Sequence, residues 1–223
     1  MKLDLISRGE TLRYMGHKGE VPEELEKILE KSENLIKSSI FPKYVYRVSE
    51  IEIFEDSENK IKFSGMPVII ESKDLINHLK GCNRAIIMAV TLTSTADRLI
   101  SCAEVNDMAE AYTLDAMCSS AIETACDIAE NEIFSEIGVK YSVWRYSAGY
   151  GDFSLSYQKD LIKFLNAEKR IGLTLTPEYL MIPRKSVTAI IGISDIPVEN
   201  KRKGCQSCNM KGKCRFSLEG GHC

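Results

Sequence analysis

The sequence predicts an α+β fold in which a mixed or antiparallel twisted sheet packs against helices. Segments with helical spacing and segments with strand-like alternation are both present, and they do not follow the regular βαβ order of parallel-sheet proteins. A chain of 223 residues with 44% apolar residues can bury a sizeable core. Polar and charged residues replace the apolar pattern after Pro197. We therefore expect a main domain over residues 1–197 and a cysteine-rich tail over residues 198–223.

A helix and a meander of short strands are expected near the start of the chain. Apolar residues within 22–40 recur every three or four positions, as in an amphipathic helix, and Pro22 suits the first helical position. Residues 44–54 alternate and are rich in β-branched and aromatic types, and residues 60–63 and 67–70 are shorter apolar runs. These three runs favour an antiparallel meander.

The middle of the chain combines a fully buried strand with the longest helix. Ser72 is a suitable cap for a helix over 73–80, and the uninterrupted apolar run 85–90 predicts a central strand covered on both faces. Apolar residues within 106–133 form one helical stripe. Three further elements are expected: a strand over 141–146, a helix over 156–168 and a buried strand over 186–194.

Charge and hydropathy argue against two classes of partner. The net charge is −3, with 29 basic and 32 acidic residues, so the surface offers no general attraction for nucleic acid or an anionic membrane. No apolar run approaches the roughly 20 residues that cross a bilayer. The N-terminus lacks the apolar block of a signal peptide. We expect a cytoplasmic protein with no nucleic-acid and no membrane partner.

The eight cysteines fall into two groups, and without an export signal we expect thiols or metal ligands rather than disulfides. The first group is scattered through apolar segments and is expected in the core: Cys82, Cys102, Cys118 and Cys126. The second group crowds the tail and forms a compact set of four thiolates: Cys205, Cys208, Cys214 and Cys223. The second group predicts a metal site.

Spacing alone does not separate zinc from an iron–sulfur cluster in the tail. Only Cys205 and Cys208 form a Cys-x2-Cys pair, whereas a zinc ribbon pairs two of them. This favours a [4Fe–4S] cluster, with zinc as the alternative. His222 is an alternative ligand to Cys223.

Residues 145–152, which we name the glycine turn, join a predicted strand to a predicted helix. Glycines at such a junction let a ligand approach the backbone closely, and the helix start offers N–H groups. On chemistry alone a simpler interpretation is preferred, in which Gly149 and Gly151 shape a turn and Arg145 makes a surface ion pair.

The run Arg145-Tyr146-Ser147-Ala148-Gly149-Tyr150 resembles the arginine-to-glycine-tyrosine signature of the activation (reactivation) domain of cobalamin-dependent methionine synthase. The resemblance extends to the threonine-rich segment 173–183 and to the helix around 121–125. Residues 8–16 and 88–98 are similar to free-standing members of that family. The matching segments follow one order over residues 8–196, so several separate motifs agree.

The resemblance implies that the chain binds S-adenosylmethionine and serves a cobalamin-binding methionine synthase or a related corrinoid protein. When the cobalamin of that partner is oxidised to inactive cob(II)alamin, a one-electron reduction is coupled to methylation by the sulfonium methyl group. The electron donor is expected to be a protein such as ferredoxin or flavodoxin. The chain shows no corrinoid- or folate-binding segment, so we expect it to act in trans, as a component of the methyltransferase.

The resemblance also assigns roles to single residues. Arg145 matches the arginine that holds the methyl donor, and a guanidinium suits a two-bond contact with its carboxylate. Ser147 and Gly149 belong to the same donor-binding signature. Glu123 matches a helical carboxylate that complements the donor's positive charge, although a solvated helix glutamate is the simpler interpretation. Tyr150 is expected where donor and corrin meet, and is the residue we assign to catalysis.

The chain departs from the better-known family members at two places. Residues 151–154, Gly-Asp-Phe-Ser, replace a proline-rich stretch, and a tyrosine expected beyond the last strand is absent from 193–196. An alternative function remains open: a non-catalytic docking module for a corrinoid protein, with a structural zinc site in the tail.

Overall fold

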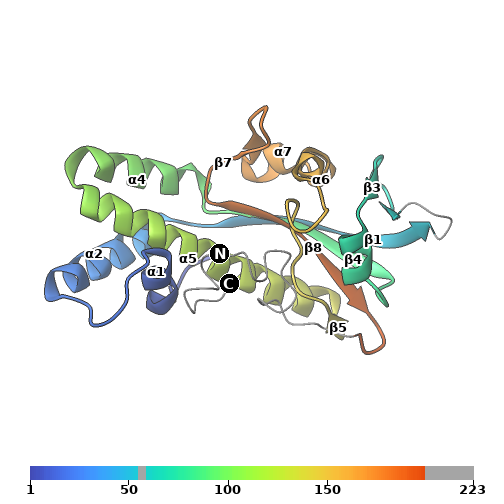
Figure 1. Cartoon of the computed structure of the whole chain (residues 1–223), viewed down its shortest axis with the longest axis horizontal. Coiled ribbons are helices and arrows are strands. Elements are labelled where there is room, and N and C mark those ends of the chain that lie inside the picture. Colours follow the sequence, from blue (N-terminus) through green and yellow to red (C-terminus); the bar gives the residue numbers. More distant parts are fainter. Residues whose placement is uncertain (55–58, 199–223) are drawn as a thin grey trace. The chain divides into compact units, whose positions relative to one another are not determined.

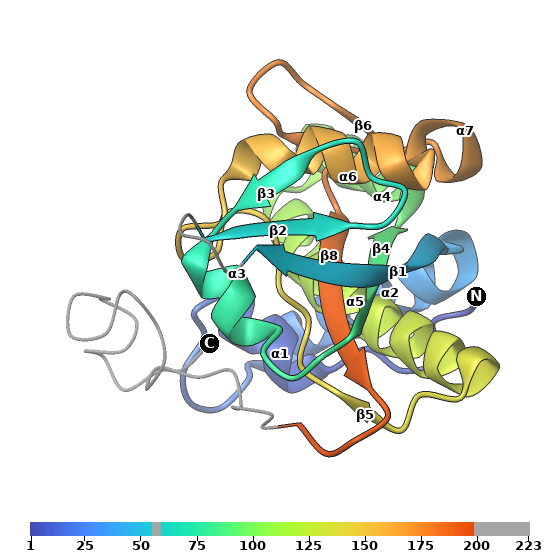
Figure 2. The ribbon, with the colours of Figure 1, turned by 90° about the vertical axis from the view of Figure 1, so that its right-hand side faces the viewer.

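The computed structural model describes residues 1–54 and 59–198, and these residues form one large sheet, one small hairpin and several helices (Figures 1 and 2). The strands are β1 (Lys43–Phe54), β2 (Lys60–Phe63), β3 (Ile69–Glu71), β4 (Arg84–Thr91), β5 (Tyr141–Ser142), β6 (Thr174–Leu175), β7 (Met181–Ile182) and β8 (Ser186–Ser194). The helices are α1 (Arg8–Tyr14), α2 (Glu23–Ser39), α3 (Lys73–His78), α4 (Thr93–Asn106), α5 (Met108–Ile137), α6 (Gln158–Leu165) and α7 (Ala167–Ile171), with a 3₁₀ turn over Leu155–Tyr157.

The large sheet has the order β3-β2-β1-β4-β8-β5, and β6 and β7 pair separately. Strands β1 and β2 are antiparallel, with Ile51 opposite Phe63, and β2 and β3 are antiparallel, with Ile61 opposite Ile70. Figure 2 shows β3, β2 and β1 side by side in this order. The predicted α+β class and the predicted meander are confirmed. Strand β4 is inside the sheet, and seven of its eight residues are buried, as its apolar run predicts.

The described chain divides into two compact units, each built from three segments. The first unit contains Met1–Tyr46, Met88–Ile137 and Ile162–Thr188, and the second contains Arg47–Ile87, Gly138–Leu161 and the segment from Ala189 onward. Strands β1, β4 and β8 and helix α6 contribute residues to both units. The division therefore cuts across the predicted main domain, and the expected boundary at residue 197 stays a prediction.

Helix α5 is the centre of the first unit. It is 30 residues long, and most of its buried residues are apolar, which confirms the predicted long helix. Helix α1 lies against α5 and is hydrogen-bonded to it beyond both of its ends: the Ser120 hydroxyl donates to the Ser7 carbonyl (3.1 Å), and the Tyr112 hydroxyl donates to the Met15 carbonyl (3.0 Å). No described helix combines the length and the apolar character that a bilayer crossing requires.

Helix α4 was not expected, and it corrects one cysteine assignment. It precedes α5 and forms a helical hairpin with it (Figure 1). Its buried residues are Ala96, Ile100 and Ala103, so alanine carries much of the apolar stripe. Cys102 lies on this helix and is exposed, so its predicted place in the core is wrong, whereas the other three cysteines of the first group are buried.

Two predicted elements are shorter than expected. The helix expected over 156–168 is interrupted at Asn166, whose φ of +54° lies in the left-handed region that asparagine tolerates. The strand expected over 141–146 forms as β5 and then continues only as an isolated bridge between Tyr146 and Ile190. Within the interruption, the Trp144 carbonyl accepts a hydrogen bond from His78 (2.7 Å) instead of from a strand.

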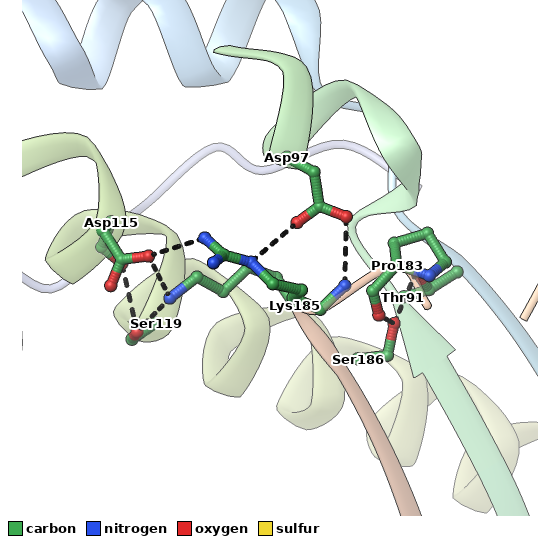
Figure 3. A network of polar contacts seen from close by, with 8 residues as sticks. Thr91, Asp97, Asp115, Ser119, Pro183, Lys185 and Ser186 are labelled. Atoms are coloured by element: carbon green, nitrogen blue, oxygen red, sulfur yellow. Dashed lines mark hydrogen bonds and ion pairs between the residues drawn. The ribbon is translucent and has the colours of Figure 1, made fainter. Parts of the chain in front are cut away.

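A polar network stabilises the start of β8 in the first unit (Figure 3). The Lys185 ammonium group forms an ion pair with Asp115 (3.0 Å) and donates to the Ser119 hydroxyl (2.9 Å). The backbone N–H of Arg184 donates to Asp97 (3.1 Å). Two basic residues at the chain's entry to β8 are thus held by carboxylates on α4 and α5.

We expect Lys185→Met to destabilise the protein by about 1–2 kcal/mol, because an ammonium side chain that is only 13% exposed loses both partners. Urea denaturation measures this loss. Lys27→Met is the matched control, since Lys27 pairs with Glu23 but is 71% exposed, and it should cost less than about 0.5 kcal/mol. Equal losses in the two variants would show that the network contributes no more than a surface pair.

Candidate functional site

The glycine turn begins where the sheet ends in the second unit. Tyr146 exchanges two backbone hydrogen bonds with Ile190 of β8, one donated (2.9 Å) and one accepted (2.8 Å). Three residues earlier, the Val143 N–H donates to the Gly192 carbonyl (3.0 Å). The chain leaves β8 after Tyr146, so the sheet fixes the position at which the turn starts.

Two glycines with left-handed backbone shape the turn itself. Gly149 has φ of +95° and Gly151 has φ of +55°, conformations that a side chain disfavours. The Tyr150 N–H donates to the Ser147 carbonyl (3.1 Å), and the Gly149 N–H donates to the Phe153 carbonyl (2.7 Å). Both N–H groups are therefore used inside the turn. A ligand would meet this turn through its side chains and its remaining backbone groups.

The structure brings four of the predicted site residues together in this one segment. Arg145 and Ser147 are half-buried, whereas Gly149 and Tyr150 are exposed. The Tyr150 ring is 38% exposed and packs edge-on to the Tyr146 ring, with the ring centres 5.7 Å apart. The Tyr150 ring is thus partly exposed and packs against the protein, and its role at a ligand stays a prediction.

A cluster of aromatic rings packs beside the turn, with His78 from α3 and the others from residues 144–153. The His78 ring stacks on Tyr146, with centres 4.8 Å apart, and meets the Trp144 ring at 4.4 Å. The Phe153 ring also stacks on Tyr146, with the ring centres 6.3 Å apart. Burial, and then the charges of nearby carboxylates, raise the pKa of Tyr146 to about 12. This phenol is neutral at pH 7, so the cluster presents no charge of its own there.

His78 is the titratable group in this cluster that the sequence did not indicate. Its Nε2 lies 2.7 Å from the Trp144 carbonyl oxygen, an acceptor, so Nε2 carries the hydrogen. Burial lowers the pKa of His78, and the bond to Trp144 offsets part of this effect. The uncharged imidazole is therefore the form that the fold favours. Because 66 positions separate the two residues, no local pattern announces the contact.

Glu123 lies on α5, in the first unit, and is exposed. Its charge acts on Tyr14: burial first, and then the charge of Glu123, raise the pKa of the Tyr14 phenol. The Arg13 guanidinium lies 4.5 Å from the centre of the Tyr14 ring. A carboxylate, a phenol and a guanidinium thus share one polar surface. That Glu123 and Arg145 bind one ligand stays a prediction, because they belong to different units.

The predicted metal ligands Cys205, Cys208, Cys214 and Cys223 lie outside the described residues. Within residues 1–54 and 59–198, no group of three or more His, Cys, Asp or Glu side chains is arranged to hold a metal ion. The metal site of the tail therefore stays a prediction.

Two comparisons with known proteins found a match. Residues 88–195 match the family described as vitamin B12 dependent methionine synthase, activation domain. A crystal structure described as the MetH reactivation domain bound to AdoHcy has the same fold: the TM-score is 0.63 at 13% identity, over 84% of this chain and 73% of that chain. No curated protein matches the chain. The matched residues include the second half of β4, together with α4, α5, the glycine turn and β8.

We expect the free energy of unfolding to decrease as the pH falls from about 6.5, the usual value for histidine, because the unfolded chain takes up a proton that folded His78 resists. This contribution is complete above pH 6.5 and disappears as the pH approaches the lower folded value. For one proton the slope is at most about 1.4 kcal/mol per pH unit. Urea titrations between pH 5 and pH 7.5 should show a flatter dependence in His78→Gln. An unchanged slope would assign the dependence to another group.

Proposed function

Because residues 88–195 belong to the activation domain family of vitamin B12 dependent methionine synthases, we propose that the chain binds S-adenosylmethionine and supports reactivation of a cobalamin-dependent methionine synthase. The observation that carries the proposal is the glycine turn, where the half-buried Arg145 and the exposed Tyr150 occur together at a sheet edge. The structural neighbour binds AdoHcy, which is S-adenosylmethionine without its methyl group, and this supports the assignment of the donor.

Arg145 suits the carboxylate end of the donor. A guanidinium makes two parallel hydrogen bonds to a carboxylate, and its partial burial strengthens such a contact relative to one in water. Ser147 and Gly149 follow on the same turn and would line the donor. Glu123 carries a negative charge on an exposed helix face and would attract the donor's ammonium or sulfonium group.

Tyr150 would stand at the boundary between the donor and the corrin of the partner. Its ring is held at one edge by Tyr146 and at a greater distance by Trp144, with 6.3 Å between ring centres. The contribution of the chain is orientation: it holds the sulfonium methyl in line with the acceptor atom of the partner, which raises the effective concentration of the two groups. Methyl transfer to the reduced cobalt releases S-adenosylhomocysteine.

The cysteine tail would supply the electron. Four thiolates at Cys205, Cys208, Cys214 and Cys223 suit a [4Fe–4S] cluster, and reductive reactivation consumes one electron from a donor such as ferredoxin or flavodoxin. A zinc site with the same ligands would instead make the tail structural, and the chain a docking module for a corrinoid protein.

We expect wild-type protein to bind S-adenosylmethionine, and Arg145→Lys to weaken binding about 10- to 100-fold, because an ammonium point charge does not reproduce a two-bond contact. Isothermal titration calorimetry measures both affinities. Arg98→Lys is the matched control, since Arg98 is an exposed arginine of α4, and it should bind normally. Normal binding by a folded Arg145→Lys variant would remove Arg145 from the site.

We expect a cob(II)alamin-loaded corrinoid partner to give the methylcobalamin spectrum when incubated anaerobically with this chain, S-adenosylmethionine and a reductant. In a Cys205→Ser/Cys208→Ser variant the rate should fall with a protein reductant but not with a strong chemical reductant, which reaches the cobalt directly. Cys102→Ser, at an exposed thiol of α4, is the control and should keep both rates. Equal rates in all three proteins, with zinc and no iron in the purified chain, would favour the docking module.

A further inference from the structure

Asp152 connects the end of the glycine turn to α3. Its carboxylate accepts hydrogen bonds from the N–H groups of Lys73 (2.9 Å) and Asp74 (3.1 Å), and from the Ser72 hydroxyl. In return, the Asp152 N–H donates to the Asp74 carboxylate (3.1 Å). The two segments are separated by more than 70 positions in the chain and are joined by reciprocal hydrogen bonds.

Gly151 lets the two segments come this close. A Cβ atom at this position would lie 2.3 Å from a carboxylate oxygen of Asp74 and 2.7 Å from the hydroxyl oxygen of Tyr146. Both distances are shorter than any real contact of a Cβ atom. The backbone of the turn therefore lies directly on α3 and on the aromatic cluster.

Phe153 holds the next position. It is 1% exposed, and its ring stacks between the rings of Tyr146 and Tyr157, with 6.3 Å and 5.8 Å between the ring centres. The Tyr157 hydroxyl in turn accepts a hydrogen bond from the Glu71 N–H (3.1 Å). The turn is thus held at its start by the bridge to β8, and at its end by Asp152 and Phe153.

Asp152 is ionised at neutral pH, as this arrangement needs. Burial acts to raise the pKa of its carboxyl, but the hydrogen bonds from Ser72 and from the N–H groups of Asp74 and Lys73 outweigh burial and lower the pKa. A charged acceptor forms stronger hydrogen bonds than a neutral one. The connection between the turn and α3 is therefore strong at the pH at which a ligand would bind.

We propose that Asp152 is a positioning residue for donor binding: it holds the end of the glycine turn on α3 and thereby fixes the Tyr150 ring for the ligand. This inference rests on the proposed function. Asp152 acts through the turn, because its carboxylate is already occupied by α3. A turn that is already ordered in the free protein loses little conformational entropy when the ligand binds.

The test compares Asp152→Ala with Asp107→Ala, a matched loss of a helix cap in the other unit. Asp107 accepts hydrogen bonds from the N–H groups of Ala109 (2.8 Å) and Glu110 (3.2 Å) at the start of α5. Both variants should lower the melting temperature by a few degrees. Only Asp152→Ala should weaken S-adenosylmethionine binding, by about tenfold, in calorimetry at a temperature where all the proteins are folded.

Trp144 supplies a second measurement that needs no ligand. It is the single tryptophan among 223 residues, and its ring lies 6.3 Å from Tyr150. Its emission should shift in Asp152→Ala and stay unchanged in Asp107→Ala. Asp152→Asn keeps the side-chain size but loses the charge and one of the two acceptor oxygens, so it should shift the emission and weaken the affinity in the same direction as Asp152→Ala, by a smaller amount. It replaces the alanine variant if that variant does not fold.

Two outcomes would overturn the inference: equal affinities in Asp152→Ala and Asp107→Ala, or an Asp152→Ala protein with unchanged Trp144 emission and wild-type affinity. Failure of the proposed function has a different result, since wild-type protein would then not bind S-adenosylmethionine at all.

Discussion

The two backbone hydrogen bonds between Tyr146 and Ile190 are the constraint on which the candidate site depends. They end the pairing of this segment with β8, so the chain must leave the sheet within a few residues. An abrupt departure next to a packed cluster of rings needs left-handed backbone, and Gly149 and Gly151 supply it. Arg145 therefore comes just before the Tyr146 bridge in the sequence and Tyr150 comes shortly after it, so the bridge to β8 fixes the backbone between them.

The packing behind the turn favours the neutral forms of two titratable rings, His78 and Tyr146. Burial lowers the pKa of His78 and raises that of Tyr146, so both shifts favour the neutral forms. The neutral imidazole donates to the Trp144 carbonyl. In the proposed function, the contact with the donor's carboxylate therefore falls to Arg145 rather than to a ring of this cluster.

The sequence predicted the sheet better than the site. Residues 186–194 were predicted as a strand with the correct ends, because a β-branched apolar run between polar ends admits few alternatives. Helix α4 was missed because its first turn lacks a side-chain cap and its buried stripe contains two alanines. The family signature located the glycine turn, but no local pattern indicated its contacts. His78 and Asp152 meet their partners 66 or more positions away, and only the tertiary fold creates those pairs.

The interactions that hold the two ends of the glycine turn differ in how much the stability of the fold depends on them. The bridge at Tyr146 is part of the large sheet, and its loss would expose a side chain that is 6% exposed, so changes there act on the whole fold. Asp152 holds the other end from an exposed position, through hydrogen bonds to a helix of six residues. Loss of these bonds frees the turn while β8 and the buried Phe153 remain in place. The residue that positions the turn is therefore not one that stabilises the sheet. A substitution at Asp152 would change the affinity for a ligand with only a small change in the stability of the sheet.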